Sequence, residues 1–277
     1  MRLELLIHDL SPGDLKSTGM ELQGLTFHVI EGVDDPLFPR AYELLWEEFH
    51  RHDEMETQSV IEKRLRGNLQ QNTPGLTLLY HMILVRKDEE FVAVRDHTAI
   101  VAEEKSEAIV HLSHALVSPE WRRKGIAGWL RAFPLQTARE ALRIQGKDKN
   151  SMITLAGEME HPNAADLTTT VRLKAYERAG YLKVDSKVVN YLQPDFRSPE
   201  IIDASGESKP LPMTLIIRRS ERETERFISG KELRNIVDHL YRMYETGVRP
   251  QDMQPVIESL SAYPADDVQI MLVPPTA

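Results

Sequence analysis

A short basic turn near the middle of the chain carries residues that could bind a phosphate group. Arg122, Arg123 and Lys124 precede Gly125, and from Ile126 onward apolar residues recur at helical spacing. The first N–H groups of a helix have no partner within the helix, and its N-terminus carries partial positive charge. Glycine lets a ligand approach the backbone closely. The turn therefore predicts an anion site of the kind that holds a pyrophosphate.

The segment before the turn is typical of a strand end. Residues 115–119 read Ala-Leu-Val-Ser-Pro, and the proline breaks the strand because it cannot donate a ladder hydrogen bond. Strand, basic turn and helix thus follow one another. In this setting the spacing Arg122-x-x-Gly125-x-Ala127 resembles the acyl-CoA signature of the GCN5-related N-acetyltransferase (GNAT) superfamily, usually written Q/R-x-x-G-x-G/A.

The resemblance implies that the chain binds acetyl-CoA. Its pyrophosphate is expected on the turn, and its pantetheine is expected to pair with the strand backbone, which would also polarise the thioester carbonyl. The cofactor-binding residues implied are Leu116, Val117, Ser118, Arg122, Arg123, Lys124, Gly125, Ile126 and Ala127. No metal is expected, because the histidines lack ligand-like spacing and the chain has no cysteine. The missing cysteine also fits direct transfer without a covalent enzyme intermediate.

A second segment resembles the same family. Tyr176 begins a Y-x-x-x-G-Y sequence that ends at Tyr181, similar to the family element whose tyrosine protonates the leaving thiolate. A phenol with a pKa of about 10 stays protonated at neutral pH, so Tyr176 is expected to be the acid. Thr169 and Arg172 stand where family members often carry an asparagine and an alanine. This helix therefore departs from the family pattern.

Amide formation also needs a base, because most amines are protonated at neutral pH. His111 lies on the strand before the turn, close to where family members that use a histidine or glutamate base place it. Strand alternation predicts that His111 and Ala115 share one face and that His114 lies on the other, so that one histidine faces the acceptor. The register favours His111, and a hydrogen-bonded or solvent-facing histidine is the alternative.

Two acidic residues follow the next strand. Glu158 and Glu160 share a face by alternation and are expected to bind a cationic acceptor. Glu158 could also take part in deprotonating the amine. A solvated strand end is the alternative for both carboxylates.

Hydrophobic periodicity predicts an α/β chain. Helices are expected from Asp35-Pro36, from a capping box at Ser59, and over residues 126–144 and 164–179, with a kink at Pro134. Strands are expected at residues 3–7, 25–31, 78–86, 91–103, 107–117, 151–158, 181–192 and 211–219. This order resembles the GNAT fold over roughly residues 25–220. The resemblance implies a mixed, mostly antiparallel sheet flanked by helices, with acyl-CoA between a splayed parallel pair, residues 107–117 and 151–158.

Two parts are expected along the chain. Residues 1–220 are predicted to form the acetyltransferase domain with a short N-terminal extension. Residues 221–277 are predicted to form a C-terminal α/β extension, mainly helical with a final strand, that packs on this domain.

Composition narrows the function. The chain has 277 residues, a net charge of -9 and 41% hydrophobic residues, which is ordinary for a soluble globular protein. No apolar run approaches the roughly 18 residues of a membrane span, and the first residues do not resemble a signal peptide. We therefore expect a cytoplasmic protein without a membrane partner. The acidic charge slightly disfavours nucleic acid and slightly favours a cationic acceptor.

These observations predict an N-acetyltransferase that transfers an acetyl group to a primary amine of a small molecule or peptide. A non-catalytic acyl-CoA sensor or scaffold is the alternative, because Thr169 and Arg172 depart from the family pattern. A nucleic-acid-binding role of the basic turn is disfavoured by the net charge. The sequence leaves the acceptor, the acyl chain and a homodimer open.

Overall fold

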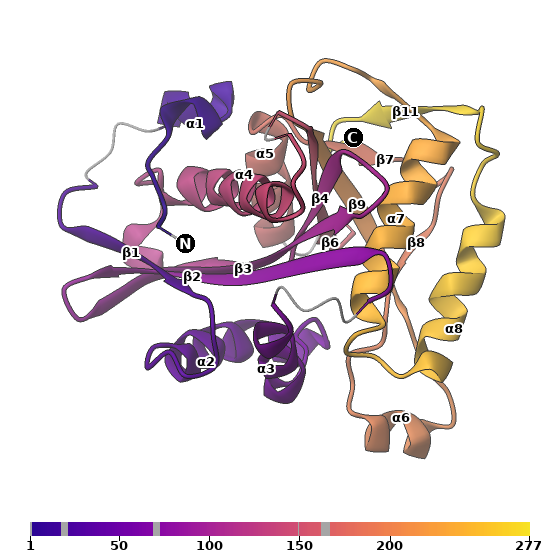
Figure 1. Ribbon diagram of the computed structural model, residues 1–277, viewed down its shortest axis with the longest axis horizontal. Helices are drawn as coiled ribbons and strands as arrows, with labels where there is room; N and C mark the ends of the chain where they lie inside the picture. The colour runs from indigo at the N-terminus through magenta and orange to yellow at the C-terminus, as the bar shows by residue number, and fades with distance from the viewer. Residues whose placement is uncertain (1, 18–21, 69–72, 149, 162–166) are drawn as a thin grey trace. The chain divides into compact units, whose positions relative to one another are not determined.

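The computed structural model describes residues 2–17, 22–68, 73–148, 150–161 and 167–277. The chain forms two compact units, Met1–Ile153 and Thr154–Ala277 (Figure 1). Residues 221–277 belong to the second unit, together with residues 154–220.

An antiparallel sheet with helices on both faces forms the first unit. Its strand order is β1-β2-β3-β4, and β5 also pairs with β3. Helices α2 and α3 lie on one face, and α1 and α4 lie on the other (Figure 1). The bounds are α1 Pro12–Ser17, β1 Leu25–Ile30, α2 Phe38–Phe49, α3 Gln58–Gly67, β2 Leu76–Lys87, β3 Glu90–Ala102, β4 Glu107–Leu112, β5 Ala115–Val117 and α4 Ile126–Ile144. Short 3-10 helices are η1 Ile7–Asp9, η2 His50–His52 and η3 Pro119–Trp121.

Side chains of β2 and β3 point alternately to the two faces of the sheet and pack against the helices on each face. Tyr80 and Met82 pack with the apolar faces of α2 and α3. Ile83, the residue after Met82, points to the other face and packs with Trp129 and Phe133 of α4. The central strands are therefore buried on both sides, and α4 is held against the sheet by large apolar side chains.

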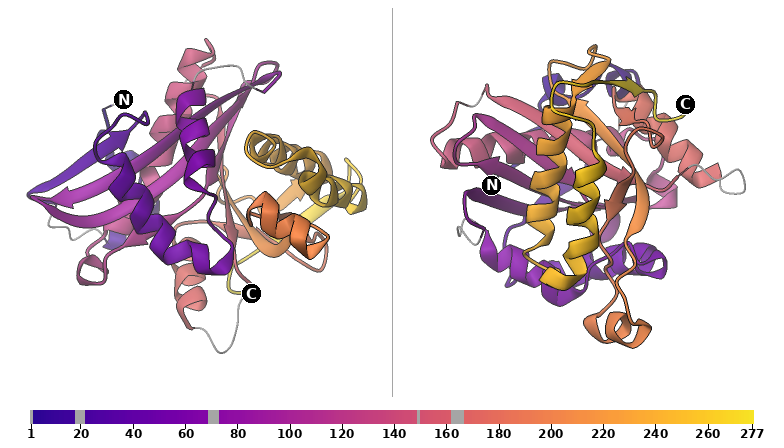
Figure 2. Two further views of the ribbon diagram at one scale, coloured as in Figure 1. Left: turned by 90° about the horizontal axis from the view of Figure 1, so that it is seen from below. Right: turned by 90° about the vertical axis from the view of Figure 1, so that its right-hand side faces the viewer.

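Antiparallel strands also organise the second unit. Its strand order is β6-β9-β7-β11-β10, and β8 also pairs with β9. Helices α7 and α8 lie side by side in this unit (Figure 2). The bounds are β6 Met152–Met159, α5 Leu167–Arg178, β7 Leu182–Val184, β8 Tyr191–Gln193, α6 Pro199–Ser205, β9 Leu211–Arg219, β10 Phe227–Ser229, α7 Gly230–Tyr244, α8 Pro250–Ser259, η4 Leu260–Ala262 and β11 Gln269–Val273.

The predicted fold class is confirmed: the sheet is open and mostly antiparallel, and helices flank it. Within the second unit, the C-terminal segment contributes helices and also strands, since β11 pairs with β7. The parallel arrangement of residues 107–117 and 151–158 stays a prediction. The start of the helix predicted over residues 164–179 lies outside the described residues, and α5 is described from Leu167.

Several predicted elements are wrong in detail. Residues 3–7 do not form a strand, because the backbone of Glu4 bonds to the side chain of Gln136. The Glu4 N–H donates to Gln136 Oε1 at 3.0 Å, and the Glu4 carbonyl accepts from Gln136 Nε2. Helix α3 begins at Gln58 with Thr57 as its N-cap, so Ser59 is not the cap. The strand predicted over residues 181–192 is divided into β7 and β8. The helix predicted over residues 126–144, in contrast, is confirmed with these bounds and contains Pro134, where a kink stays a prediction.

The strand predicted over residues 107–117 is divided into β4 and β5. His111 of β4 lies opposite Thr98, whereas Ala115 of β5 lies opposite Arg95, so the register shifts by one residue between them. One extra residue on one strand is a β-bulge, which reverses the alternation of side chains beyond it. The break places two histidines of this segment differently from the prediction, as described below.

Candidate cofactor and acceptor sites

The turn between β5 and α4 presents a row of backbone donors. Arg123 and Gly125 adopt left-handed φ angles of 63° and 81°, and Gly125 is the N-cap of α4 without a side-chain capping bond. Within the described part of the chain, the N–H groups of residues 123–127 donate no hydrogen bond. Consecutive donors at the positive end of a long helix form an anion site. The structure thus provides the donors that the sequence predicted.

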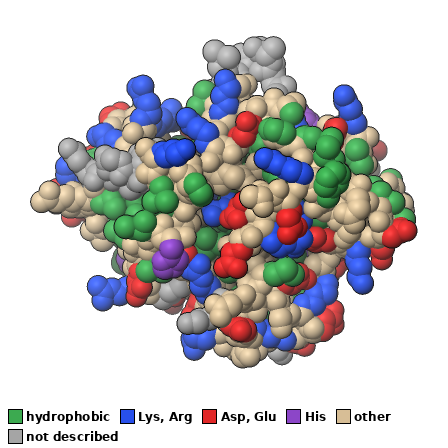
Figure 3. Space-filling model, turned by 90° about the horizontal axis from the view of Figure 1, so that it is seen from above, with side chains coloured by type: hydrophobic (Ala, Val, Ile, Leu, Met, Phe, Trp, Pro, Cys, Tyr) green, Lys and Arg blue, Asp and Glu red, His purple; other side chains and the backbone are tan. Residues whose placement is uncertain are grey.

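Basic and aromatic side chains surround this row. Trp121 is 8% exposed and donates from its indole nitrogen to Glu90 at 2.7 Å. Lys124 lies over the Trp121 ring, with Nζ 4.2 Å from the ring centre. Arg122 donates from Nε to the Val117 carbonyl at 3.1 Å. The basic side chains of the turn are exposed, so their charge surrounds the donors. Figure 3 shows one face of the molecule, where Lys and Arg side chains occur together with Asp and Glu side chains.

Strand β5 offers an edge beside the turn. The Ser118 N–H donates to β3 at 3.0 Å, and the His114 carbonyl accepts from β3 at 3.2 Å. In an antiparallel ladder these bonds recur at every second residue. Leu116 and Ser118, both expected to contact pantetheine, therefore direct their backbone groups toward β3. The backbone groups of Ala115 and Val117 point away from β3, toward the other edge of β5.

The bulge brings His111 and His114 to the same face of the sheet. His111 lies opposite Thr98, and the His114 ring nitrogen Nδ1 lies 3.0 Å from Asp96 Oδ1. Thr98 and Asp96 share a face, because they are two residues apart in β3. The prediction that the two histidines occupy opposite faces is wrong. Ala115, predicted on the face of His111, lies on the opposite one.

Electrostatics distinguish the two histidines. His114 is 8% exposed, and its Nε2 lies 2.8 Å from the Glu54 carbonyl, so both ring nitrogens are engaged. Burial alone would lower the pKa of His114, but the Asp96 carboxylate and its hydrogen bond raise it above the usual value. Burial likewise would raise the pKa of Asp96, yet His114 and its hydrogen bonds lower it to about 2. An imidazolium that donates from both nitrogens is a poor base.

His111 fits the base role better than His114. It is 3% exposed, and its Nδ1 lies 3.0 Å from the Ser113 hydroxyl oxygen. The Ser113 hydroxyl on Nδ1 orients the ring. The catalytic role of His111 stays a prediction.

Glu158 and Glu160, at the end of β6, have different surroundings. Glu160 pairs with Arg172 and accepts from the Thr169 hydroxyl at 2.8 Å. A cation of the protein itself thus pairs with Glu160. The amine-binding role of Glu160 stays a prediction. Thr169 and Arg172, which depart from the family pattern, are the residues that hold Glu160. Glu158 accepts instead from Tyr191 and Tyr244, two residues to which the sequence assigned no functional role.

Tyr176 occupies the last turn of α5 and is half-buried. Its ring meets the edge of Tyr181, with centroids 4.9 Å apart and planes at 84°. Gly180 has φ 82°, which lets the Tyr181 N–H donate to the Tyr176 carbonyl at 3.0 Å and end the helix. Tyr176 and Glu158 belong to the second unit, and His111 and the basic turn belong to the first. Their combination in one site stays a prediction.

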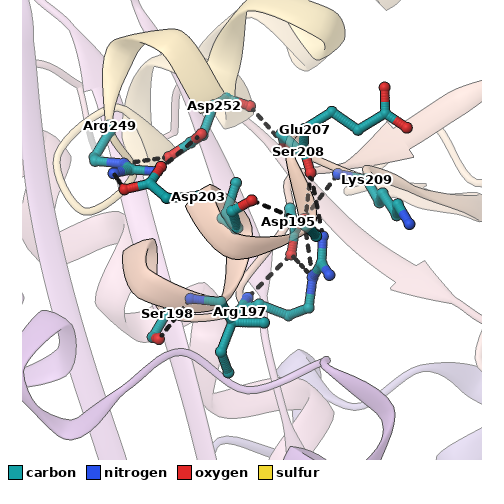
Figure 4. Close-up of polar contacts among 12 residues, drawn as sticks. Asp195, Arg197, Ser198, Asp203, Glu207, Ser208, Lys209, Arg249 and Asp252 are labelled. Carbon is teal, nitrogen blue, oxygen red and sulfur yellow. Dashed lines mark hydrogen bonds and ion pairs between the residues drawn. The ribbon is translucent and has the colours of Figure 1, made fainter.

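Another polar cluster of the second unit consists of arginines paired with carboxylates and stabilises a loop (Figure 4). Asp195, 4% exposed, accepts from the guanidinium of Arg197. Burial would raise the pKa of Asp195, but hydrogen bonds from Arg197 and a backbone N–H lower it. Arg249 pairs with Asp203 of α6 and Asp252 of α8. Each arginine here has a carboxylate, so the cluster stabilises the loop that carries α6.

The described residues offer neither a cluster of metal ligands nor a membrane-spanning helix. Residues 2–17, 22–68, 73–148, 150–161 and 167–277 contain no group of three or more acidic or histidine side chains that could hold a metal ion. In the same ranges no helix combines the length and the hydropathy needed to cross a membrane.

Comparison with known proteins gives matches among solved structures. No protein-family model and no curated protein matches the chain. Many similar structures are acetyltransferases, and some are described as GNAT proteins. A tandem GNAT protein from the clavulanic acid biosynthesis pathway is 19% identical, with a TM-score of 0.38, covering 61% of this chain and 46% of its own. This chain therefore spans about half of that protein.

Two further structures are covered almost completely. An acetyltransferase from Thermus thermophilus is 16% identical, with a TM-score of 0.36 and coverage of 72% of this chain and 99% of that one. A putative acetyltransferase from Salmonella typhimurium, solved with its cofactor acetyl-CoA, is 12% identical, with a TM-score of 0.36 and coverage of 71% and 93%. At these similarities, an assignment of function depends on the residues of this chain.

Proposed function

We propose that the chain is an acetyl-CoA-dependent N-acetyltransferase that moves an acetyl group directly to a primary amine. The row of N–H donors at residues 123–127, beside the edge of β5, is the observation that supports this most. A diphosphate fits the donors and the basic side chains around them. An extended chain of amides fits the outward backbone groups of Ala115 and Val117. Acetyl-CoA carries both groups in one molecule.

Each residue of the proposed site then has a task. Bound acetyl-CoA supplies an activated acetyl thioester. Arg122 and the N–H groups of residues 123–127 hold the pyrophosphate, and the β5 backbone orients the pantetheine. His111 takes a proton from the ammonium form of the acceptor, directly or through water. Tyr176 holds a proton at its hydroxyl for the leaving thiolate, and Glu158 attracts the positive charge of the acceptor.

The cofactor site can be tested with one glycine variant. Gly125→Glu adds bulk and negative charge to the donor row, so acetyl-CoA should raise the melting temperature of the wild type and not that of the variant. Gly146→Glu is the matched control. Gly146 also has a left-handed φ, 64°, and lies just beyond the other end of α4, where an added Cβ has nothing within 4 Å. Equal shifts in the wild type and Gly125→Glu would refute the cofactor site.

A second measurement separates the enzyme from a non-catalytic acyl-CoA sensor. Free CoA thiol is followed during incubation with acetyl-CoA and a panel of amines. Tyr176→Phe keeps the ring and removes the proton donor, so kcat should fall by roughly 10²–10⁴-fold with acetyl-CoA affinity unchanged. No thiol release by the wild type would favour the sensor. An unchanged kcat in Tyr176→Phe would remove the acid role and leave the cofactor site in place.

A further inference from the structure

An arginine inside the first unit carries a charge without a carboxylate partner among the described residues. Arg95 of β3 is 1% exposed, and within the described part of the chain its Nε and Nη1 atoms are buried without a hydrogen-bond partner. A guanidinium group keeps its proton in proteins, so the charge is permanent. A buried charge without a partner costs several kcal/mol. The first unit therefore retains this positive charge at a cost in stability.

The surroundings of Arg95 on its face of the sheet are neutral or positive. His97, two residues further along β3, shares this face, and its Nε2 lies 2.8 Å from a hydroxyl of α4. Burial, and then the charges of His81 and Arg95, lower the pKa of His97 well below its usual value. Asp96 points to the opposite face, where its carboxylate is bonded to His114. This carboxylate therefore does not pair with the guanidinium.

Arg95 stands next to the strand that is proposed to hold the thioester. It lies opposite Ala115 in the ladder of β3 and β5. The neighbouring pair carries the hydrogen bond, because the Asp96 N–H donates to the His114 carbonyl at 3.2 Å. Opposite residues without hydrogen bonds have Cα atoms only about 4.5 Å apart. The positive charge is thus one strand away from the edge where the backbone of Ala115 points outward.

We propose that Arg95 supplies positive potential that stabilises the thioester oxygen as it becomes negative. This inference rests on the proposed acetyltransferase function. In that reaction the amine nitrogen bonds to the carbonyl carbon, and the electron pair of the C=O bond moves to the oxygen. The pair then restores the C=O bond as the C–S bond breaks and the thiolate leaves. A fixed charge in a water-poor interior acts strongly on such a developing charge, whereas a carboxylate partner would cancel its effect.

Arg95→Met tests the inference, since it keeps an unbranched side chain and removes the charge. We expect kcat to fall by about 10–100-fold, less than the roughly 10²–10³-fold loss of a direct oxyanion donor. Acetyl-CoA should still raise the melting temperature. The variant itself should melt about 2 °C or more above the wild type in tryptophan fluorescence, because an unpaired buried charge is gone. An arginine needed only for structure would instead lower the melting temperature of its variant, and that result would overturn the inference.

Arg64→Met is the matched control. Arg64 is also a buried arginine of the first unit, 7% exposed, but it donates to the carboxylate of Glu56 at 2.6 Å. Its loss leaves a buried carboxylate unpaired, so this variant should melt below the wild type. The two arginine variants are therefore expected to change stability in opposite directions. Arg95→Gln, which is also uncharged, replaces Arg95→Met if that variant does not fold.

Infrared spectroscopy of bound acetyl-CoA, labelled with ¹³C at the thioester carbonyl, gives a readout that needs no turnover. Positive potential at the oxygen weakens the C=O bond, so the stretching frequency should be lower in the wild type than in Arg95→Met. Arg64→Met should give the wild-type frequency. If the wild type acetylates an amine and Arg95→Met has the same kcat, the electrostatic role is wrong and the proposed function stands. If the wild type releases no thiol, the proposed function fails, and equal frequencies in the wild type and Arg95→Met would overturn the inference separately.

Discussion

Two buried histidines beneath α4 make the stability of the first unit depend on pH. His81 and His97 are 1% and 0% exposed, and their ring nitrogens lie 3.1 and 2.8 Å from the Thr137 hydroxyl. Burial lowers the pKa of His81 from 6.5 to about 4 and that of His97 well below its usual value. The unfolded chain therefore binds protons at a pH where the folded unit does not. Stability is full above pH 6.5 and falls as the pH drops toward 4.

The size of the His81 contribution follows from its pKa. A lowering from 6.5 to about 4, at about 1.4 kcal/mol per pKa unit, makes His81 responsible for a loss of roughly 2–3 kcal/mol between pH 7 and pH 4.5. The Glu31 carboxylate, 3.6 Å from His81, favours the protonated form but is half exposed. His114 acts in the opposite direction, because its pKa is raised and its protonation stabilises the folded unit. A variant of His81 alone isolates its own share.

Urea unfolding of His81→Gln at pH 7 and pH 4.5 measures this share. Trp46, Trp121 and Trp129 all belong to the first unit, so tryptophan fluorescence follows that unit. The difference in free energy of unfolding between the two pH values should be smaller in the variant by roughly 2–3 kcal/mol. His8→Gln is the control, because the His8 side chain is 71% exposed. The same pH dependence in the wild type and His81→Gln would refute the reasoning.

Other variants test single contacts in the two units. Arg64 donates two hydrogen bonds to Glu56, which is 5% exposed. Arg64→Ala should therefore lower the free energy of unfolding by about 3–5 kcal/mol, measured by urea unfolding with tryptophan fluorescence. A loss below about 1 kcal/mol would contradict the pairing. Thr137→Val removes the hydroxyl that contacts both histidine rings and should lower the free energy of unfolding by about 1–3 kcal/mol in the same assay. Unchanged stability would mean that the rings find other hydrogen-bond partners. Gly230→Ala would place a Cβ 2.1 Å from the Ala265 carbonyl oxygen and should destabilise the second unit by at least about 1–3 kcal/mol. The midpoint of urea unfolding, followed by near-UV circular dichroism, should then fall. An unfolding midpoint equal to that of the wild type would count against this clash.

Local physical chemistry explains the part of the fold that the sequence predicts well. Periodicity and turn residues are sufficient for β1, α2, β2 and β3, because each depends on the alternation of apolar residues within one segment. The donor row at residues 123–127 is local too, since a helix that follows a glycine turn leaves its first N–H groups without partners. Both kinds of feature are therefore visible without knowledge of distant contacts.

Distant contacts explain the errors. The segment 3–7 has a strand-like pattern, but Gln136, far along the chain, satisfies the backbone of Glu4. The bulge between β4 and β5 depends on Asp96, whose carboxylate accepts from the His114 N–H at 2.8 Å. Nothing in the segment 107–117 itself marks the extra residue. The faces of His111 and His114 could therefore not be assigned by alternation alone.

The two carboxylates at the end of β6 show how such contacts decide function. Alternation treats Glu158 and Glu160 alike, since both stand at the end of the same strand and share a face. The fold gives Glu160 a cation from α5 and gives Glu158 neutral hydroxyl donors from β8 and α7. Tyr244 is the last residue of α7, and its side chain is buried. Its hydroxyl connects residues 221–277 to the carboxylate proposed to bind the acceptor.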